Sequence, residues 1–284
     1  MRATGPFRRV MSIALYVVLA WLALVAWLAL NERRLLFFPD RTLAAEPADF
    51  GLRAEEVSIA VEDGVTLHGW WIAGPGERVL IWYHGNAGNI AHRLPNASWF
   101  VDTLGVSVVL VDYRGYGRST GRPDEAGVYR DGLAVYDAVA ARGAAARDIV
   151  LFGRSLGGAV ATEVALQRPA GALVLEAAFR SARAMARVHY WFVPSALVRT
   201  RMDNESKIGR VPVPTLFLHG DRDRIVPLDH SRRLYELAAR PEHFHVIEGA
   251  GHNDTYLVGG ALYAEVWQAF LRQTASDLPI QGER

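Results

Sequence analysis

The feature that most constrains this chain is a series of short, continuous apolar runs separated by helix-compatible stretches. Continuous apolar runs suit strands of a parallel sheet, because helices cover both faces of such a sheet. Strands that alternate with helices predict an α/β fold with a mostly parallel central sheet and helices on both faces. The apolar runs occupy residues 79–83, 106–111, 149–152, 172–175, 215–218 and 244–247. The helical stretches occupy residues 91–104, 124–141, 156–166, 229–239 and 262–272.

A different pattern precedes these runs. Residues 57–61 and 65–71 alternate apolar and polar side chains, and residues 62–64 (Glu-Asp-Gly) separate them. Two alternating runs around an Asp-Gly pair predict a β-hairpin, so we expect an antiparallel hairpin that leads into the sheet. The α/β domain is therefore expected over residues 54–276, with a C-terminal tail at 277–284.

The N-terminal part is apolar in another way. Residues 10–30 carry no charged side chain, and as a helix they would be about 31 Å long, enough to cross a bilayer. A cleaved signal peptide has a shorter apolar region and a small-residue cleavage site. We therefore expect residues 1–34 to form an uncleaved membrane anchor, with a signal peptide or a buried helix as the alternatives.

Charges that flank this run bear on its orientation. Arg2, Arg8 and Arg9 precede it, whereas Arg33 and Arg34 follow it. Positive residues accumulate on the cytoplasmic side of a membrane helix. The difference of one arginine favours a single-pass protein with its N-terminus in the cytoplasm and its main domain on the extracytoplasmic side.

Two segments interrupt the α/β pattern. Residues 35–53 contain two prolines and mixed charge and are expected as a linker. Within it, residues 35–39 either rest at the lipid interface or form a strand or turn packed on the domain. Residues 179–210 are longer than a simple crossover helix needs. They are expected to form a small lid, the alternative being a crossover helix with an aromatic packing face.

Composition excludes several function classes. The chain has 284 residues, a formal net charge of +1 and no cysteine. A balanced charge gives no electrostatic basis for nucleic-acid binding. The absence of cysteine excludes a disulfide scaffold, a cysteine nucleophile and a zinc ribbon.

One motif carries the chemistry. Gly153, Arg154, Ser155, Leu156 and Gly157 form a G-x-S-x-G sequence between a predicted strand and a predicted helix. In that context the chain must reverse sharply, which places the serine hydroxyl at the top of the sheet as a nucleophile. The N-terminus of the following helix adds partial positive charge where an oxyanion would form.

A serine hydroxyl needs a base and an acid to become nucleophilic. His252 lies in a Gly-rich loop after the last predicted strand, at the expected edge of the sheet. Asp221 and Asp223 both follow the strand at 215–218, and Glu176 ends an earlier strand. Asp223 lies further into its loop, Asp221 is better placed to bind backbone, and Glu176 suits a buried hydrogen-bonding role. The acid would hold the His252 tautomer.

An oxyanion hole needs two N–H donors. The N–H of Leu156, next after the nucleophile, is one. The loop that begins at His84 follows an early strand and contains Asn86, whose N–H is the expected second donor. His243 and His245 share one face of a predicted strand, but no third metal ligand lies nearby in the sequence. We therefore expect no metal and no cofactor.

At this point the chain resembles the α/β-hydrolase superfamily. More narrowly, it is similar to small membrane-anchored serine hydrolases of the α/β-hydrolase-domain group, relatives of which include protein depalmitoylases. The resemblance covers about residues 35–275 and follows the family's order of motifs. Its segments lie at residues 36–39, 84–89, 112–119, 153–158, 219–223 and 251–252. One departure is the Glu-Ala-Ala-Phe sequence at 176–179, where the family commonly has Glu-Ser-Pro-Phe.

The resemblance implies site roles and a reaction. It places the catalytic acid at Asp223 and the catalytic histidine at His252, with Ser155 as nucleophile. The expected activity is hydrolysis of acyl esters or thioesters through an acyl-enzyme, on a small lipophilic substrate. The alternatives are a serine peptidase of the aminopeptidase kind and a non-catalytic membrane-anchored binding protein.

Overall fold

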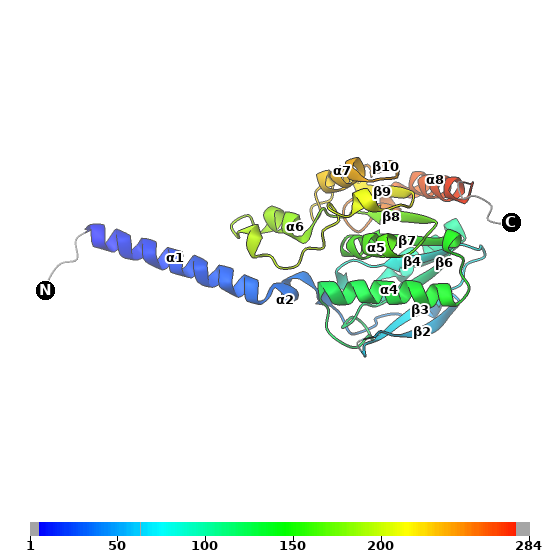
Figure 1. Cartoon of the computed structure of the whole chain (residues 1–284), viewed down its shortest axis with the longest axis horizontal. Helices are drawn as coiled ribbons and strands as arrows, with labels where there is room; N and C mark the ends of the chain where they lie inside the picture. Colours follow the sequence, from blue (N-terminus) through cyan, green and yellow to red (C-terminus); the bar gives the residue numbers. More distant parts are fainter. Residues whose placement is uncertain (1–5, 63, 277–284) are drawn as a thin grey trace.

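The computed structural model describes residues 6–62 and 64–276, so Arg2, Asp63 and the predicted tail at 277–284 lie outside the described residues. Eight strands form one central sheet (Figure 1). They are β2 (Ala54–Ala60), β3 (Thr66–Ile72), β4 (Val79–Tyr83), β6 (Ser107–Val111), β7 (Ile149–Arg154), β8 (Ala172–Glu176), β9 (Thr215–Gly220) and β10 (Pro241–Ile247).

The strand order explains why the apolar runs are continuous. The order is β10-β9-β8-β7-β4-β6-β3-β2. The strands from β10 to β6 are parallel, whereas β3 pairs antiparallel with both β2 and β6. Every residue of β4, β6, β7, β8 and β9 is buried. The predicted α/β architecture with its antiparallel N-terminal hairpin is confirmed.

Helices cover both faces of the sheet. α4 (Glu125–Ala141), α5 (Leu156–Gln167) and α7 (Leu228–Leu237) pack on one face in a cluster with Ile81, Leu151 and Phe217. α3 (Leu94–Trp99) and α8 (Thr255–Ser276) pack on the other face with Trp82 and Phe152. Because parallel strands end at the same edge, the loops after β4, β7, β8 and β9 meet there.

Two predicted helices differ in form. The stretch at 91–104 is not one helix: a 3-10 turn η2 (Ile90–Arg93), α3 and a π-helical turn η3 (Phe100–Leu104) follow one another. Pro95 lies in the first turn of α3, where its missing N–H breaks no helical bond. The last helix starts at Thr255, earlier than predicted, and bends at Gly260, whose φ is 50°.

An apolar helix projects from the domain at the N-terminus. α1 (Pro6–Leu30) extends away from the sheet in Figure 1, and a short α2 (Glu32–Leu36) links it to the domain. Residues 8–30 are long and apolar enough to span a membrane, and few are buried. In the expected linker, β1 (Phe38–Pro39) pairs with β5 (Ala87–Gly88), and Phe37 is buried.

The segment at 179–210 lies between β8 and β9 and turns toward α1 (Figure 1). It contains α6 (Ala182–His189) and the 3-10 turns η5 (Ser195–Leu197) and η6 (Ile208–Arg210). We call residues 179–210 the lid segment.

Candidate active site

The backbone around Ser155 has the shape of a sharp strand-to-helix turn. Ser155 follows β7 directly, with φ 55° and ψ −119°, and α5 begins at the next residue. A non-glycine residue in that region is strained, and such strain occurs at functional positions. The N–H of Ser155 donates to the Glu176 carbonyl at 2.9 Å, which helps to hold the turn.

Gly157 allows the turn to lie close to the neighbouring strand. A Cβ at this position would lie 1.8 Å from the carbonyl oxygen of Tyr83, at the end of β4. A side chain there would therefore push α5 off the sheet. Since the first N–H groups of a helix have no partner inside the helix, the Leu156 N–H is left for another acceptor.

Asp223 and His252 are joined by a short hydrogen bond. His252 Nδ1 lies 2.6 Å from Asp223 Oδ2, and the Asp223 side chain is fully buried. Because an ionised carboxylate only accepts, Nδ1 carries the hydrogen and Nε2 is left with its lone pair. That tautomer is the one a general base requires.

Several donors hold Asp223 as a carboxylate. Burial raises its pKa, but hydrogen bonds from His219, His252 and the Val226 N–H outweigh burial and lower its pKa well below the usual range. Its other oxygen, Oδ1, accepts from the N–H groups of Ile225 and Val226 at 2.8 and 2.9 Å. The carboxylate thus stays charged and fixed in direction.

The other two acid candidates have different partners. Asp221 is exposed and accepts from the Gly249 N–H at 2.6 Å, the backbone role that its position predicted. Glu176 is fully buried and accepts from the hydroxyls of Thr255 and Tyr263 at 2.7 and 2.5 Å. Of the three carboxylates, Asp223 is the one hydrogen-bonded to His252.

Arg154 holds the histidine loop, a role that the sequence analysis missed. Its Nε lies 3.1 Å from Glu176 Oε1, and both side chains are buried. Its Nη2 donates to the His252 carbonyl at 3.1 Å and to Thr255 Oγ1 at 3.2 Å. A charged residue between a buried strand and the nucleophile was the available signal, because a buried charge needs a partner.

Asn86 is held by two neighbours. The Tyr116 hydroxyl donates to the Asn86 carbonyl at 2.7 Å, and the Phe38 N–H donates to Asn86 Oδ1 at 3.2 Å. These bonds hold Asn86, whose N–H is the second expected oxyanion donor. A Cβ on the preceding Gly85 would lie 3.6 Å from the Ser155 Cβ, so the Asn86 loop passes close to the nucleophile.

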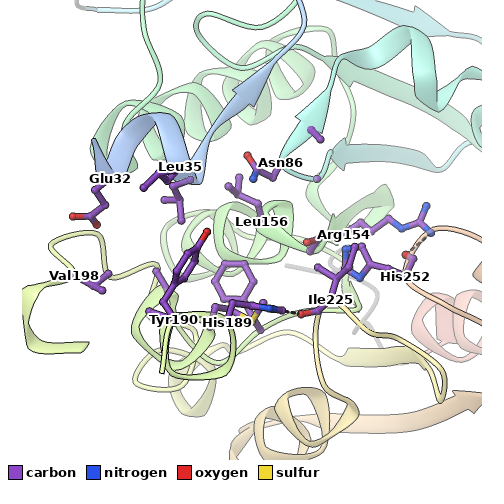
Figure 2. A pocket seen from close by; sticks show the side chains of 18 of the residues that line it. Glu32, Leu35, Asn86, Arg154, Leu156, His189, Tyr190, Val198, Ile225 and His252 are labelled. Carbon is purple, nitrogen blue, oxygen red and sulfur yellow. Dashed lines mark hydrogen bonds between the residues drawn. The ribbon is translucent and has the colours of Figure 1, made fainter. Parts of the chain in front are cut away.

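One cavity of about 580 Å³ brings these groups together (Figure 2). Ser155, Leu156, Asn86, Arg154 and His252 line it on the side of the sheet. Its other walls are mostly apolar and come from α2, the lid segment and the loop after β9: Leu35, Phe179, Met185, Tyr190, Val198 and Ile225.

The lid segment is tied to the acid loop by a hydrogen bond. His189 Nε2 donates to the Ile225 carbonyl at 2.7 Å, drawn as a dashed line in Figure 2. Ile225 in turn donates its N–H to Asp223. The wall that faces the nucleophile is therefore connected to the residue that orients His252.

Ser155 and His252 both line the cavity. In the described part of the chain (residues 6–62 and 64–276), no hydrogen bond joins these two side chains. In sites without substrate this contact is commonly long and tightens when substrate binds. The residues that the structure describes also contain no group of three or more side chains suited to a metal ion.

Comparisons with known proteins bear on the family of this chain. A family model described as serine aminopeptidase, S33 matches residues 75–208. The uncharacterized protein Rv2307c of Mycobacterium tuberculosis is 35% identical, over 94% of this chain and 96% of its own length. The Arabidopsis thaliana α/β hydrolase domain-containing protein WAV2 is 33% identical, over 89% and 91%.

Solved structures match the fold. The Pyrococcus furiosus esterase Pf2001 aligns with a TM-score of 0.68 at 20% identity, covering 84% of this chain and 98% of that one. With relatives above 30% identity along most of the chain and this shared fold, the protein belongs to the α/β-hydrolase superfamily.

Proposed function

We propose that the protein is a membrane-anchored serine hydrolase that cleaves acyl esters or thioesters. The observation that carries this proposal is the Asp223–His252 hydrogen bond together with a strained Ser155, since Ser155 and His252 line the same largely apolar cavity. Membership of the superfamily supports hydrolysis in general, and these residues favour ester or thioester hydrolysis by a serine nucleophile.

In the proposed reaction, Ser155 Oγ attacks the acyl carbonyl carbon while His252 Nε2 takes the hydroxyl proton. The N–H groups of Leu156 and Asn86 stabilise the oxyanion. The tetrahedral intermediate collapses, the alcohol or thiol leaves with the proton from His252, and an acyl-serine remains. Water, deprotonated by His252, then attacks the acyl-serine; the bond to Ser155 Oγ breaks, His252 returns the proton to Oγ, and the carboxylic acid is released.

The cavity wall favours an apolar acyl group. Leu35, Met185, Tyr190 and Ile225 line the cavity, and apolar contacts of this kind bind a hydrocarbon chain. The charged lining residue Glu32 accepts hydrogen bonds from the backbone of Arg199 and Thr200. Each oxygen of this carboxylate therefore already accepts a backbone hydrogen bond.

The alternative is a serine aminopeptidase, favoured by the name of the matching family model. Such an enzyme must bind the free ammonium group of its substrate with an acidic side chain. Besides Glu32, the charged residues Arg154 and Arg93 line the cavity, and their positive charge disfavours an ammonium group. We therefore place ester hydrolysis first.

The membrane part of the proposal rests on α1. Residues 8–30 have a mean hydropathy of 2.5 in their most apolar window, and the helix lies outside the domain. The flanking arginines favour a single span with the domain on the extracytoplasmic side. Because the chain has no cysteine, replacing the exposed Asp229 of α7 (Asp229→Cys) gives a single labelling site. Labelling of this variant in intact cells by a membrane-impermeant maleimide supports this side, and labelling only after lysis refutes it.

A fluorescent fluorophosphonate tests the nucleophile. We expect one covalent adduct on Ser155 in the folded full-length chain and none on Ser155→Ala. The exposed Ser58→Ala variant on β2 is the matched control and must label normally. A folded protein that forms no adduct would support a non-catalytic binding protein on this fold.

A substrate panel then distinguishes an esterase or thioesterase from a peptidase. We would compare p-nitrophenyl esters of two to sixteen carbons and the matching thioesters with aminoacyl-nitroanilides. The ester proposal expects hydrolysis that rises with chain length and no release from the anilides. Preferential release from the anilides would make the protein a peptidase.

A further inference from the structure

We propose that residues 190–198, here called the lid loop, enter the bilayer beside α1 and open the Ser155 cavity to the acyl chains of that leaflet. The inference rests on the proposed function in two respects: α1 is a membrane helix, and Ser155 is the nucleophile. It adds the route of the substrate, which is an acyl lipid drawn sideways from the membrane.

The lid loop touches α1 well before the end of that helix. Trp21 Nε1 donates to the Phe192 carbonyl at 3.1 Å, and Val25 is buried on a helix that is otherwise largely exposed. Since a helix rises about 1.5 Å per residue, Trp21 lies about 14 Å inside the end of α1 at Leu30. A loop at that level lies within the apolar layer if α1 spans it.

A second contact fixes the same arrangement from the other side. Glu32, at the start of α2, accepts from the N–H groups of Arg199 and Thr200 at 3.0 and 2.7 Å. These two residues follow the lid loop directly. The loop is thus held to the N-terminal helices at Trp21 and at Glu32, and it cannot swing away without breaking both contacts.

The side chains of the lid loop suit lipid rather than water. Trp191 is 81% exposed and Leu197 is 44% exposed, and residues 190–198 include no charged side chain. Arg187 and Arg199 flank this run. Apolar side chains bordered by arginines, with a tryptophan among them, suit a segment that enters a membrane while its flanking charges stay at the interface.

Part of the lid-loop backbone is hydrogen-bonded within the lid segment. The N–H groups of Tyr190, Val193, Leu197 and Val198 donate to carbonyls of the lid segment itself at 2.7 to 3.2 Å. Pro194 has no N–H to satisfy. Backbone polar groups need partners where water is excluded, so these bonds lower the cost of entering lipid.

The cavity continues toward this loop. A small second pocket of about 60 Å³ lies between the end of α1 and the lid loop. Glu32, Ala186, Tyr190 and Val198 line both this pocket and the large cavity. An acyl chain that leaves the bilayer between α1 and the lid loop therefore meets shared walls on its way to Ser155.

Depth-dependent quenching tests the position of the loop. Three full-length variants, Val17→Cys on α1, Trp191→Cys in the lid loop and Ser58→Cys on β2, would carry an environment-sensitive fluorophore. Each is reconstituted in phosphatidylcholine vesicles that contain nitroxide lipids, with the nitroxide on the acyl chain or on the headgroup. We expect acyl-chain quenching at positions 17 and 191 and none at position 58.

The outcomes separate the inference from its basis. Quenching at 17 without quenching at 191 would overturn the lid-loop inference and leave the anchor intact. No quenching at 17 would overturn the anchor and the inference together. The readout needs no enzymatic activity, so it is independent of whether Ser155 is a nucleophile.

A second measurement tests the route. We expect Trp191→Glu to lower hydrolysis of a long-chain ester embedded in vesicles by about tenfold, the loss equivalent to one large apolar side chain leaving lipid. Hydrolysis of water-soluble p-nitrophenyl acetate should stay within about twofold. Leu262→Glu, which places the same charge at an exposed position of α8, is the matched control and should change neither rate. Equal loss on both substrates would refute the route.

Discussion

The two walls of the cavity are built in opposite ways. The wall at the sheet edge is held by buried charges and hydrogen bonds, from Glu176 through Arg154 to the His252 loop and from the backbone to Asp223. The lid wall consists of one short helix and irregular chain with exposed apolar side chains. Groups that move protons need fixed positions, whereas an acyl chain needs only apolar surface that adapts to it.

The largest expected effect is on the rigid wall. Ser155→Ala should lower kcat/KM for p-nitrophenyl butyrate by about 10⁴-fold to 10⁶-fold, because covalent catalysis is lost. Steady-state kinetics would measure it, with Ser58→Ala as the control of unchanged rate. A loss below about tenfold would mean that Ser155 is not the nucleophile.

The second test compares two aspartates on one loop. Asp223→Asn should lower kcat by about 10⁴-fold, because an amide no longer selects the His252 tautomer. Asp221→Asn should cost less than about tenfold, since that side chain contacts the Gly249 backbone instead. The same kinetic assay measures both variants. The reverse ranking would move the acid to Asp221.

The third test breaks the buried pair behind the site. Arg154→Met should lower the free energy of unfolding by about 3 to 5 kcal/mol, since Glu176 is left charged and buried. Adding Glu176→Gln should restore part of that loss, because the unpaired charge is removed. Urea denaturation of both variants measures the effect, and simple additivity of the two losses would show that the pair is not coupled.

The fourth test concerns the point where the lid segment leaves the sheet. The Arg180 N–H donates to His230 Nδ1 at 3.3 Å, which requires a neutral ring. Burial, with the charge of Arg180, lowers the pKa of His230 to about 4. Between about pH 4 and the ordinary histidine pKa of about 6.5, His230 is neutral in the folded protein but protonated in the unfolded chain.

The contribution of His230 to the free energy of unfolding should therefore be constant above about pH 6.5. Toward about pH 4 it should fall by at most about 1.4 kcal/mol per pH unit. Thermal unfolding from pH 4 to 8 measures the slope. His230→Asn keeps an acceptor for the Arg180 N–H and cannot titrate, so its slope should be smaller. An unchanged slope would show that His230 contributes nothing to it.

The smallest expected effect is on the lid wall. Tyr190→Ala should lower kcat/KM for long-chain p-nitrophenyl esters by about threefold to tenfold and leave the acetate rate within about twofold, because only the chain contacts this wall. A uniform loss for all chain lengths would mean that the lid wall also positions the reacting atoms, which would remove the contrast between the walls.

Much of the fold followed from local pattern. The alternating hairpin and the continuous apolar runs predicted the sheet, because the pattern of apolar side chains along a strand reflects which of its faces are buried. The helix at 91–104 was wrong in form, because packing breaks it into η2, α3 and η3. The bend at Gly260 was missed for the same reason.

For the candidate site, the sequence by itself determined the residue types and the loops that carry them. A G-x-S-x-G between strand and helix, aspartates after a buried strand and a histidine in a late Gly-rich loop are local patterns, and parallel strands carry such loops to one edge. Only the tertiary structure decided which carboxylate bonds His252, how Arg154 ties Glu176 to the His252 loop, and that the lid loop lies against α1. These contacts join residues far apart in the chain, and side chains with several possible partners are assigned only when packing brings one of them within reach.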